Sequence, residues 1–314
     1  RSRVVDVVKY GRKLQALVLD SGEAIAGEAF VDATGTAGPM GNCLRYGNGC
    51  AMCILRCPAF GPRVSVAARA QVKEMMGLKA DGSFGAMSGS CKLNKGSLSP
   101  DLRERLEREG AVVIPVPEGM TRNASLGRKA CSQYAIAEYA ANIVLLDTGH
   151  AKLMTSYFPL EELRAIPGLE NARYEDPYAG GMGNSVRYLG IAPCDNALKV
   201  EMIDNLFAGG EKSAILVGHT EAIVTGLLAG HNAVRHCLDM PYLELPRSLA
   251  AGDFIAFVHE QMKSRDGLRL RYTFSGSVYY ERMKVIFLYS TDRKVIGERV
   301  AQAGLSDVYS RNLV

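Results

Sequence analysis

The chain has 314 residues, with 47% hydrophobic and 22% charged residues, which is typical of a globular protein with a sizeable core. Its 37 Lys and Arg residues stand against 33 Asp and Glu residues. This weak basic excess permits a nucleic-acid partner without indicating one. No apolar run approaches the roughly 20 residues of a membrane span, and the chain opens without a secretory signal pattern. We therefore expect a cytoplasmic protein with no membrane-embedded segment.

The first third of the chain predicts a meander of strands followed by an irregular loop. The expected strands cover residues 4–8, 14–19 and 23–31. The last strand runs into the turn Asp32-Ala-Thr-Gly-Thr36, and residues 37–64 are rich in Gly, Pro and Cys. Because the chain opens with Arg1 and runs directly into a strand pattern, we expect a protein that is truncated at its N-terminus.

Four cysteines in this loop form a candidate metal or redox site. Cys43, Cys50, Cys53 and Cys57 are spaced C-x6-C-x2-C-x3-C, and a proline follows the last one. The end of this run is typical of iron–sulfur ligands. Zinc is a second interpretation, although these are not the usual finger spacings. A redox-active pair of Cys50 and Cys53 is a third, and ordinary buried thiols are a fourth.

The middle of the chain predicts a mixture of helices and strands. Ser65 and Ser99 are the expected N-caps of two helices, and Gly110 ends the second. The expected helices cover residues 65–76, 100–109, 128–146 and 159–165, and the expected strands cover residues 111–116 and 151–157.

A strand, a glycine turn and a helix start form the most informative segment. Apolar residues run into Gly209, Gly210 and Glu211, and a second turn begins at Gly218 and His219. Glycine lets a backbone approach a ligand closely, and the first N–H groups of a helix point outward at its positive end. The segment therefore predicts a site for an anionic or electron-rich ligand.

The helix that follows is expected over residues 220–237. Gly226, Gly230 and Ala233 share one face of it, so we expect that face to pack tightly on a sheet. Beyond it, we expect a helix over residues 247–262, and two strands and a helix within residues 268–314.

Three segments resemble the glucose-inhibited division protein A family and its relative, the folate- and FAD-dependent tRNA uracil methyltransferase. Residues 205–233 resemble the last flavin-contacting segment, with His219 where that family has Tyr. Residues 245–257 resemble a Leu-Pro-Arg segment that follows it. Residues 30–36 resemble the Ala-Thr-Gly turn that closes over the adenosine half of FAD. Together they cover about a fifth of the chain, and the cysteine run lies outside them.

The resemblance implies FAD as the cofactor. It implies tRNA as a partner and is compatible with a homodimer. The residues that it places at the cofactor are Thr34, Gly35, Gly209, Gly210, Glu211, Gly218, His219 and Glu221.

The expected fold is α/β, with part of a Rossmann-type FAD/NAD(P)-binding domain that includes the meander. Residues 1–40 and 195–240 form that part, residues 41–194 an inserted α+β substrate-type domain, and residues 241–314 a small α+β tail. No Gly-x-Gly-x-x-Gly loop, which holds a dinucleotide pyrophosphate, occurs in the sequence.

The resemblance implies an FAD-dependent oxidoreductase. One alternative is a flavoprotein that passes electrons to an iron–sulfur or dithiol centre between Cys43 and Cys57. Another is a cofactor-binding or interaction fragment without enzymatic activity. The substrate does not follow from the sequence.

Overall fold

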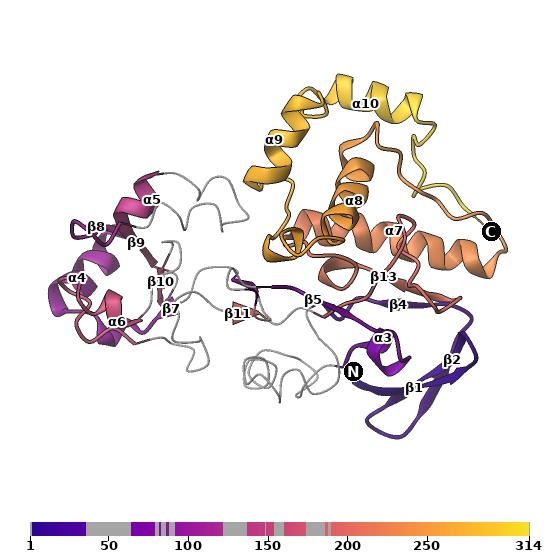
Figure 1. The fold of residues 1–314 in the computed structure, drawn as a ribbon, viewed down its shortest axis with the longest axis horizontal. Helices are drawn as coiled ribbons and strands as arrows, with labels where there is room; N and C mark the ends of the chain where they lie inside the picture. The colour runs from indigo at the N-terminus through magenta and orange to yellow at the C-terminus, as the bar shows by residue number, and fades with distance from the viewer. Residues whose placement is uncertain are drawn as a thin grey trace. The chain divides into compact units, whose positions relative to one another are not determined.

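The computed structural model divides the chain into two compact units (Figure 1). The described residues are 2–35, 64–78, 82, 86–87, 92–121, 137–147, 149–153, 160–173, 186–187 and 190–313. Unit 1 comprises Arg1–Gly85, Tyr188–Phe274 and Val278–Val314, and unit 2 comprises Ala86–Arg187 and Ser275–Ser277. None of the helices in the described ranges is both long and apolar enough to cross a bilayer.

Unit 1 begins with the predicted three-stranded meander. Its strands β1 (Val4–Tyr10), β2 (Lys13–Leu19) and β3 (Ala24–Ala26) pair antiparallel in that order. Gly11, with a φ of +56°, makes the first turn. The expected third strand over residues 23–31 is wrong in length, because the chain leaves the meander after Ala26 and Phe30 enters the core in a different sheet.

That second sheet pairs two strands that lie far apart in the sequence. Strand β4 (Phe30–Asp32) runs parallel to β13 (Leu206–Ala208). Asn205 is fully buried and joins this sheet to the meander, since its Oδ1 accepts from Leu14 N and its Nδ2 donates to Leu14 O, both at 2.9 Å. The surrounding core consists of Leu14, Phe30, Val66, Ala67, Ala70, Val72, Ala192, Val200, Ile203, Leu206 and Ala208.

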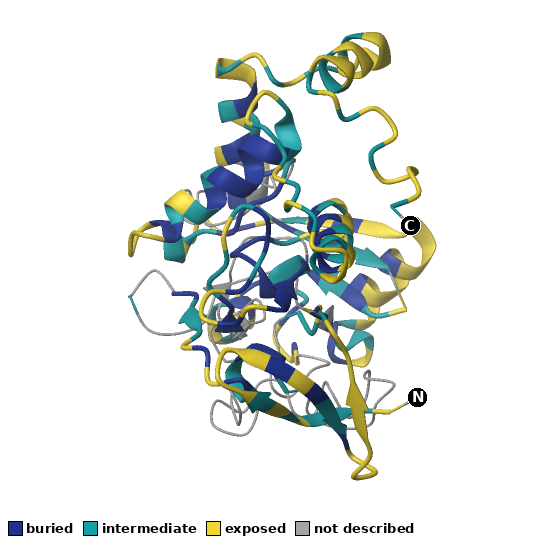
Figure 2. Cartoon of the chain, turned by 90° about the vertical axis from the view of Figure 1, so that its right-hand side faces the viewer, coloured by how far each residue is buried: buried dark blue, intermediate teal, exposed yellow. Residues whose placement is uncertain are grey.

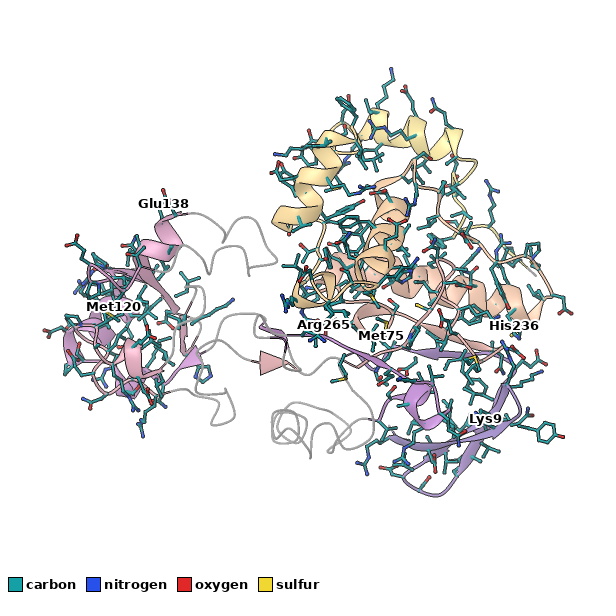
Figure 3. The ribbon with its side chains drawn as sticks, viewed as in Figure 1. Lys9, Met75, Met120, Glu138, His236 and Arg265 are labelled. Carbon is teal, nitrogen blue, oxygen red and sulfur yellow. The ribbon has the colours of Figure 1, made fainter. Side chains whose placement is uncertain are left out.

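The segment between β4 and strand β5 is less helical than expected. Ser65 caps a helix as predicted, because its Oγ accepts from Ala68 N at 3.2 Å. The helix α3 (Val66–Arg69) nevertheless ends after one turn, so the helix expected over residues 65–76 is wrong beyond it. Gln71 has a φ of +68°, which helices do not allow. Strand β5 (Met75–Met76) then pairs with β12 (Gly190–Ile191). The end of α3 is also tied to β1, because Lys9, which Figure 3 labels, donates from its Nζ to Ala70 O at 2.8 Å.

Helices dominate the rest of unit 1. Among the described residues they are η4 (Gly210–Lys212), α7 (His219–Cys237), α8 (Ala250–Gln261), η5 (Gly267–Arg269), α9 (Ser277–Val285), whose first residue is counted in unit 2, and α10 (Arg293–Gln302). The two strands expected within residues 268–314 are wrong. Tyr279 and Met283 are buried four residues apart, as one helix face requires, whereas Tyr272 makes an isolated bridge to Leu216. Helix α10 contributes no buried side chain (Figure 2).

Unit 2 contains a four-stranded antiparallel sheet with helices against it. The strand order is β7 (Lys92–Leu93), β10 (Ala151–Leu153), β9 (Asn142–Asp147) and β8 (Ala111–Pro115). The other elements of the unit are β6 (Ala86–Met87), η1 (Lys95–Ser97), α4 (Pro100–Glu109), α5 (Ala137–Ala141), α6 (Leu160–Leu163) and β11 (Val186–Arg187). Its core includes Leu93, Leu102, Leu106, Val112, Ile143, Leu145, Leu153, Leu163, Ile166 and Leu169.

Two of the helix predictions in unit 2 have opposite outcomes. Helix α4 is confirmed, since Ser99 Oγ accepts from Leu102 N at 3.3 Å and Gly110 ends the helix with a φ of +73°. The helix expected over residues 128–146 is wrong from residue 142 onward. Ile143 and Leu145 are buried in alternation and pair with β8, so this apolar run has the period of a strand.

Candidate functional site

The two glycine turns singled out in the sequence leave the same edge of one parallel sheet. Asp32 of β4 pairs with Ala208 of β13, and Gly209 N donates to Asp32 O at 3.0 Å. In open parallel sheets, ligands bind where the carboxyl ends of neighbouring strands meet. The fold therefore brings together two motifs that are about 170 residues apart along the chain.

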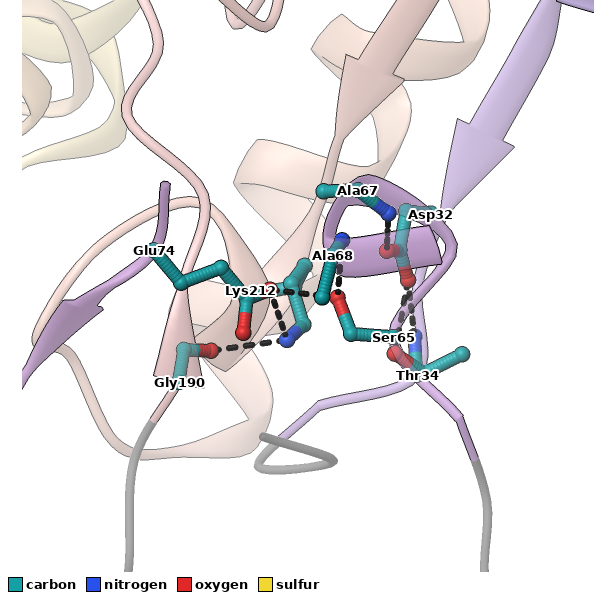
Figure 4. A network of polar contacts seen from close by, with 8 residues as sticks. All are labelled: Asp32, Thr34, Ser65, Ala67, Ala68, Glu74, Gly190 and Lys212. Atoms are coloured by element: carbon teal, nitrogen blue, oxygen red, sulfur yellow. Dashed lines mark hydrogen bonds and ion pairs between the residues drawn. The ribbon is translucent and has the colours of Figure 1, made fainter. Parts of the chain in front are cut away.

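The buried carboxylate of Asp32 organises the first turn (Figure 4). Its Oδ1 accepts from Thr34 N at 3.1 Å and from Thr34 Oγ1 at 2.6 Å. Its Oδ2 accepts from Ala67 N, in the first turn of α3, at 3.1 Å. Gly35 follows with a φ of +66°. The Thr34 hydroxyl thus holds the turn together, and Gly35 provides the backbone conformation that the turn requires.

The second turn has its amide groups largely committed inside the protein. A Cβ on Gly209 would lie 3.2 Å from Gly226 Cα, so the strand end and α7 approach each other closely at this point. Gly210 has a φ of +64°, and its N donates to Thr225 Oγ1 at 2.8 Å. Together with the bond from Gly209 N to Asp32 O, this leaves the N–H groups of both glycines engaged. Their role is to shape the turn.

The start of α7 retains free donors. Gly218 has a φ of +133°, and a Cβ there would collide with the carboxylate of Glu221. Glu221 is 4% exposed, and its Oε1 accepts from Phe274 N at 2.6 Å. This carboxylate therefore ties the start of α7 to the segment before α9. His219 and Thr220 are exposed, and their N–H groups meet no acceptor in the part of the chain that the structure describes.

The small-residue face predicted for α7 is wrong in part. Gly226 does face the strand end at Gly209, but a Cβ on Gly226 or on Gly230 would point into open space. The buried side chains of the helix are Glu221, Thr225, Leu228, Ala229, Asn232 and Ala233. The packed face therefore lies beside the glycines, and the close approach depends on Gly209 more than on Gly230.

A buried ion pair between Lys212 and Glu74, which sequence reasoning missed, lies beside both turns (Figure 4). The Lys212 and Glu74 side chains are both fully buried, and Lys212 Nζ lies 2.9 Å from Glu74 Oε1 and 2.7 Å from Gly190 O. Ser65 Oγ also bonds Glu74 Oε1, and Ser65 caps the helix that Asp32 holds. Glu74 Oε2 is a buried acceptor without a partner in the described chain. A lysine in a polar turn carries no sequence signal of burial.

The cysteine prediction lies outside the described residues. Cys43, Cys50, Cys53 and Cys57 all fall between residues 35 and 64. Among the residues that are described, no group of three or more His, Cys, Asp or Glu side chains is arranged to hold a metal ion.

Comparison with known proteins shows that one segment of the chain is similar to a known family. Residues 146–241 match the family model described as glucose inhibited division protein A. The chain is 30% identical over 115 residues to the tRNA uridine 5-carboxymethylaminomethyl modification enzyme MnmG of Metamycoplasma arthritidis, covering 36% of this chain and 18% of that protein. It is 36% identical over 96 residues to the MnmG enzyme of Desulfotalea psychrophila, covering 29% and 13%.

Solved structures extend the likeness of the fold. Aquifex aeolicus GidA in its form II crystal matches with a TM-score of 0.50 at 17% identity, over 96% of this chain and 56% of that one. The form I crystal matches with a TM-score of 0.50 at 15% identity, over 95% and 59%. The chain thus spans a little over half of the GidA chains and a smaller share of the MnmG enzymes. Its fold is a mixed α/β fold that resembles part of GidA, and residues 146–241 are similar to the glucose inhibited division protein A family.

Proposed function

We propose that this chain forms part of the FAD site of a GidA-type, FAD-dependent oxidoreductase. The observation that carries the proposal is the parallel pairing of β4 with β13. It brings the Asp32–Gly35 turn and the Gly209–Gly210 turn to one sheet edge, and these are the two turns that resemble flavin-contacting segments.

The open polar atoms at this edge suit a dinucleotide. The start of α7 offers the N–H groups of His219 and Thr220 at the positive end of a 19-residue helix, which favours a phosphate or another electron-rich group. The fit is thus to a ligand that carries acidic oxygens, as FAD does.

The residues of the site divide into those that shape it and those that would touch the cofactor. The first group forms hydrogen bonds within the protein and consists of Asp32, Thr34, Gly209, Gly210 and Glu221. In the proposed site the helix start at Gly218 and His219, with the backbone around Gly35 and Glu211, would hold FAD. Bound FAD would supply hydride or electron transfer.

In this proposal the FAD-binding part lies within unit 1, and unit 2, which includes Ala86–Arg187, supplies the substrate-type insertion. The curated relatives are tRNA uridine modification enzymes by name, so tRNA is the substrate class that we propose by resemblance.

Flavin analysis of the protein from its natural source tests the proposal. We expect the protein to be yellow and to contain bound FAD. The variant Gly218→Val should lose that FAD, because valine disfavours the backbone φ of +133° and its Cβ would collide with the Glu221 carboxylate. Gly230→Ala is the matched control, since its Cβ enters open space on the same helix. Natural protein without flavin would overturn the proposal.

A further inference from the structure

Two arginine side chains converge on one glycine in unit 1. Gly82 has a φ of +81°, and a Cβ on it would lie 3.2 Å from Arg265 Nη2 and 3.7 Å from Arg269 Nη2. Both guanidinium groups therefore face the space that a side chain at residue 82 would fill. Both arginines, of which Figure 3 labels Arg265, are exposed, so a ligand in solution can reach them.

The turn that carries the arginines is held by its own backbone. It follows α8 and includes η5. Gly267 N donates to Ser264 Oγ at 3.0 Å, and Leu268 O accepts from Leu78 N at 2.8 Å. A Cβ on Gly267 would collide with Gln261 O, so the backbone packs closely at this point. Both side chains thus start from fixed positions, and fixed positions lower the cost of binding a ligand.

Positive charge dominates this turn. Residues 263–271 contain Lys263, Arg265, Arg269 and Arg271, with Asp266 as the one acidic residue. Arg269 Nη1 lies 3.0 Å from Asp266 Oδ1, but the Asp266 side chain is 89% exposed, so water screens this pair. Arg265 has no acidic partner among the described residues. Two like charges that face one space repel each other, and an anion between them would remove that repulsion.

The arginine turn leads directly to the start of α7. Tyr272 follows Arg269 by three residues, and its O accepts from Val217 N at 3.0 Å. Val217 immediately precedes Gly218, the N-cap of the helix. An anion held by the arginines would therefore lie on the segment that also supports this helix start.

Phosphate chemistry matches the arrangement better than a single carboxylate does. The planar guanidinium fork donates parallel hydrogen bonds to phosphate or carboxylate oxygens. Two cations are balanced by the two phosphates of a pyrophosphate or by successive phosphates of an RNA backbone, whereas one carboxylate would leave a positive charge unbalanced.

We propose that Arg265 and Arg269, with the gap at Gly82 between them, form a phosphate-binding site. The site takes either the pyrophosphate of a dinucleotide or the backbone phosphates of an RNA. The phosphate chemistry stands without the proposed function, and only the choice between these two sources rests on it.

Calorimetric titration of the protein with inorganic pyrophosphate tests the site by itself. We expect Arg265→Gln and Arg269→Gln each to weaken binding about 10-fold, because each removes hydrogen bonds from a cation to a charged acceptor. Arg265→Lys keeps the charge but not the planar fork, so its affinity should fall between that of the wild type and that of Arg265→Gln. Arg293→Gln removes an exposed arginine from α10 and is the matched control, which should bind like the wild type.

A pair of glycine variants tests the gap. Gly82 and Gly22 have similar φ values of +81° and +86°, so alanine adds similar backbone strain at both. A Cβ on Gly22 meets nothing within 4 Å, whereas a Cβ on Gly82 enters the space between the arginines. The arginine ends can move aside at little cost in stability, but they then lose their common focus. Gly82→Ala should therefore lose pyrophosphate affinity, Gly22→Ala should retain it, and the two should be equally stable in urea.

Flavin content and RNA titration of the same variants identify the source of the phosphate. Loss of bound FAD in Arg265→Gln would assign the site to the pyrophosphate of the dinucleotide. Unchanged FAD would assign it to RNA if a ribonucleotide oligomer of about 12 nucleotides binds less tightly to Arg265→Gln. The slope of log affinity against log salt should then become shallower by about 0.7, which corresponds to one lost phosphate contact.

The remaining outcomes count against the proposal. Wild-type protein that does not bind pyrophosphate would overturn it, and so would equal affinities of Arg265→Gln and Arg293→Gln. Equal affinities of Gly82→Ala and Gly22→Ala would show that the gap has no part in binding. Pyrophosphate binding that depends on Arg265, with FAD and the oligomer both unaffected, would overturn both sources. Natural protein without flavin would end the proposed function, and the pyrophosphate result would still decide this inference.

Discussion

At the residue scale, the glycines at the sheet edge act through conformation and close approach. Gly218 and Gly210 have φ values of +133° and +64°, which favour glycine. Gly209 has an ordinary φ of −128°, but its missing side chain makes room for α7. The two requirements are different, so the same substitution should have different costs at these positions.

We expect Gly209→Val to separate β13 from α7, to lower the free energy of unfolding by about 2–3 kcal/mol through overpacking, and to abolish flavin binding. A Cβ at this position would lie 3.2 Å from Gly226 Cα, a backbone atom that cannot turn aside. Chemical denaturation and flavin content measure the two effects. Gly226→Ala is the control, because its Cβ enters open space. Normal flavin content in folded Gly209→Val would show that the turn has no part in cofactor binding.

His259 should make stability depend on pH in the acidic range. Burial lowers its pKa in the folded state below the unfolded value of 6.5. A hydrogen bond with the Ser213 backbone and the charge of Asp195 act in the opposite direction, and the charge of Lys263 acts in the same one. As the pH falls below 6.5, the unfolded state takes up a proton that the folded state resists. Stability is therefore retained above pH 6.5 and lost below it, by up to about 1.4 kcal/mol per pH unit.

Urea denaturation between pH 5 and 7.5 measures this slope. His259→Gln should flatten it, whereas His219→Gln, at an exposed position, should retain it. An unchanged slope in His259→Gln would assign the acid sensitivity to other groups.

Part of the site could be predicted at this scale. Gly35, Gly209 and Gly218 stand out because glycine after a strand or just before a helix indicates a turn or a close approach of the backbone. Asn205, Glu74 and Lys212 could not be recognised, because their roles depend on partners that are distant in the sequence. Asn205 bonds Leu14, and the Lys212–Glu74 ion pair joins segments 138 residues apart.

At the element scale, the sequence predicted helices with strong end signals and misjudged short apolar runs. Helix α4 has a serine N-cap, a proline in its first turn and a C-terminal glycine, and local chemistry decides it. Residues 142–146 form a strand because they pair with the neighbouring strand β8, which lies about 30 residues earlier in the sequence. The segment after residue 268 forms a helix where strands were expected, and Tyr279 of that helix packs on Phe254 and Phe257. This packing is a tertiary effect that local sequence does not reveal.

An ion pair should contribute to the attachment of α9 to α8, beside the packing of Tyr279. Arg282 donates to both oxygens of Asp253 at 2.8 and 2.7 Å, and Asp253 is 2% exposed. We expect Asp253→Ala to lower the free energy of unfolding by about 2–3 kcal/mol, somewhat less than for a fully buried pair, because the Arg282 side chain is 31% exposed.

The matched control is Arg247→Ala. Its ion pair with Glu260 has both side chains 50% exposed, so the expected loss is below about 1 kcal/mol. Urea denaturation compares the two variants. Equal losses would mean that the Asp253–Arg282 pair adds nothing beyond a surface contact.

At the scale of the whole molecule, the cysteine run is the main feature that the proposed flavin site does not use. It directly follows the Asp32–Gly35 turn in sequence. We predict that at least two of the sulfurs of Cys50, Cys53 and Cys57 share a metal ion, a cluster or a disulfide. Iron, sulfide and zinc analysis of anaerobically purified protein, with thiol counting, measures this. Three free thiols without metal would leave ordinary buried cysteines as the interpretation.

The extent of the cofactor site within these 314 residues is the other question at this scale. The chain aligns with 56% of the GidA chain, and its sequence contains no Gly-x-Gly-x-x-Gly loop. Such a loop contributes several N–H bonds to a dinucleotide pyrophosphate, each with a net value of about 1–3 kcal/mol when the acceptor is charged. The start of α7 alone cannot replace them. We therefore expect the 314-residue chain by itself to bind FAD weakly or not at all. Titration of the purified chain, followed by flavin fluorescence, measures the affinity, and Gly218→Val gives the background. A stoichiometric yellow complex of the chain that is lost in Gly218→Val would show that the edge formed by β4, β13 and α7 is sufficient to hold the cofactor.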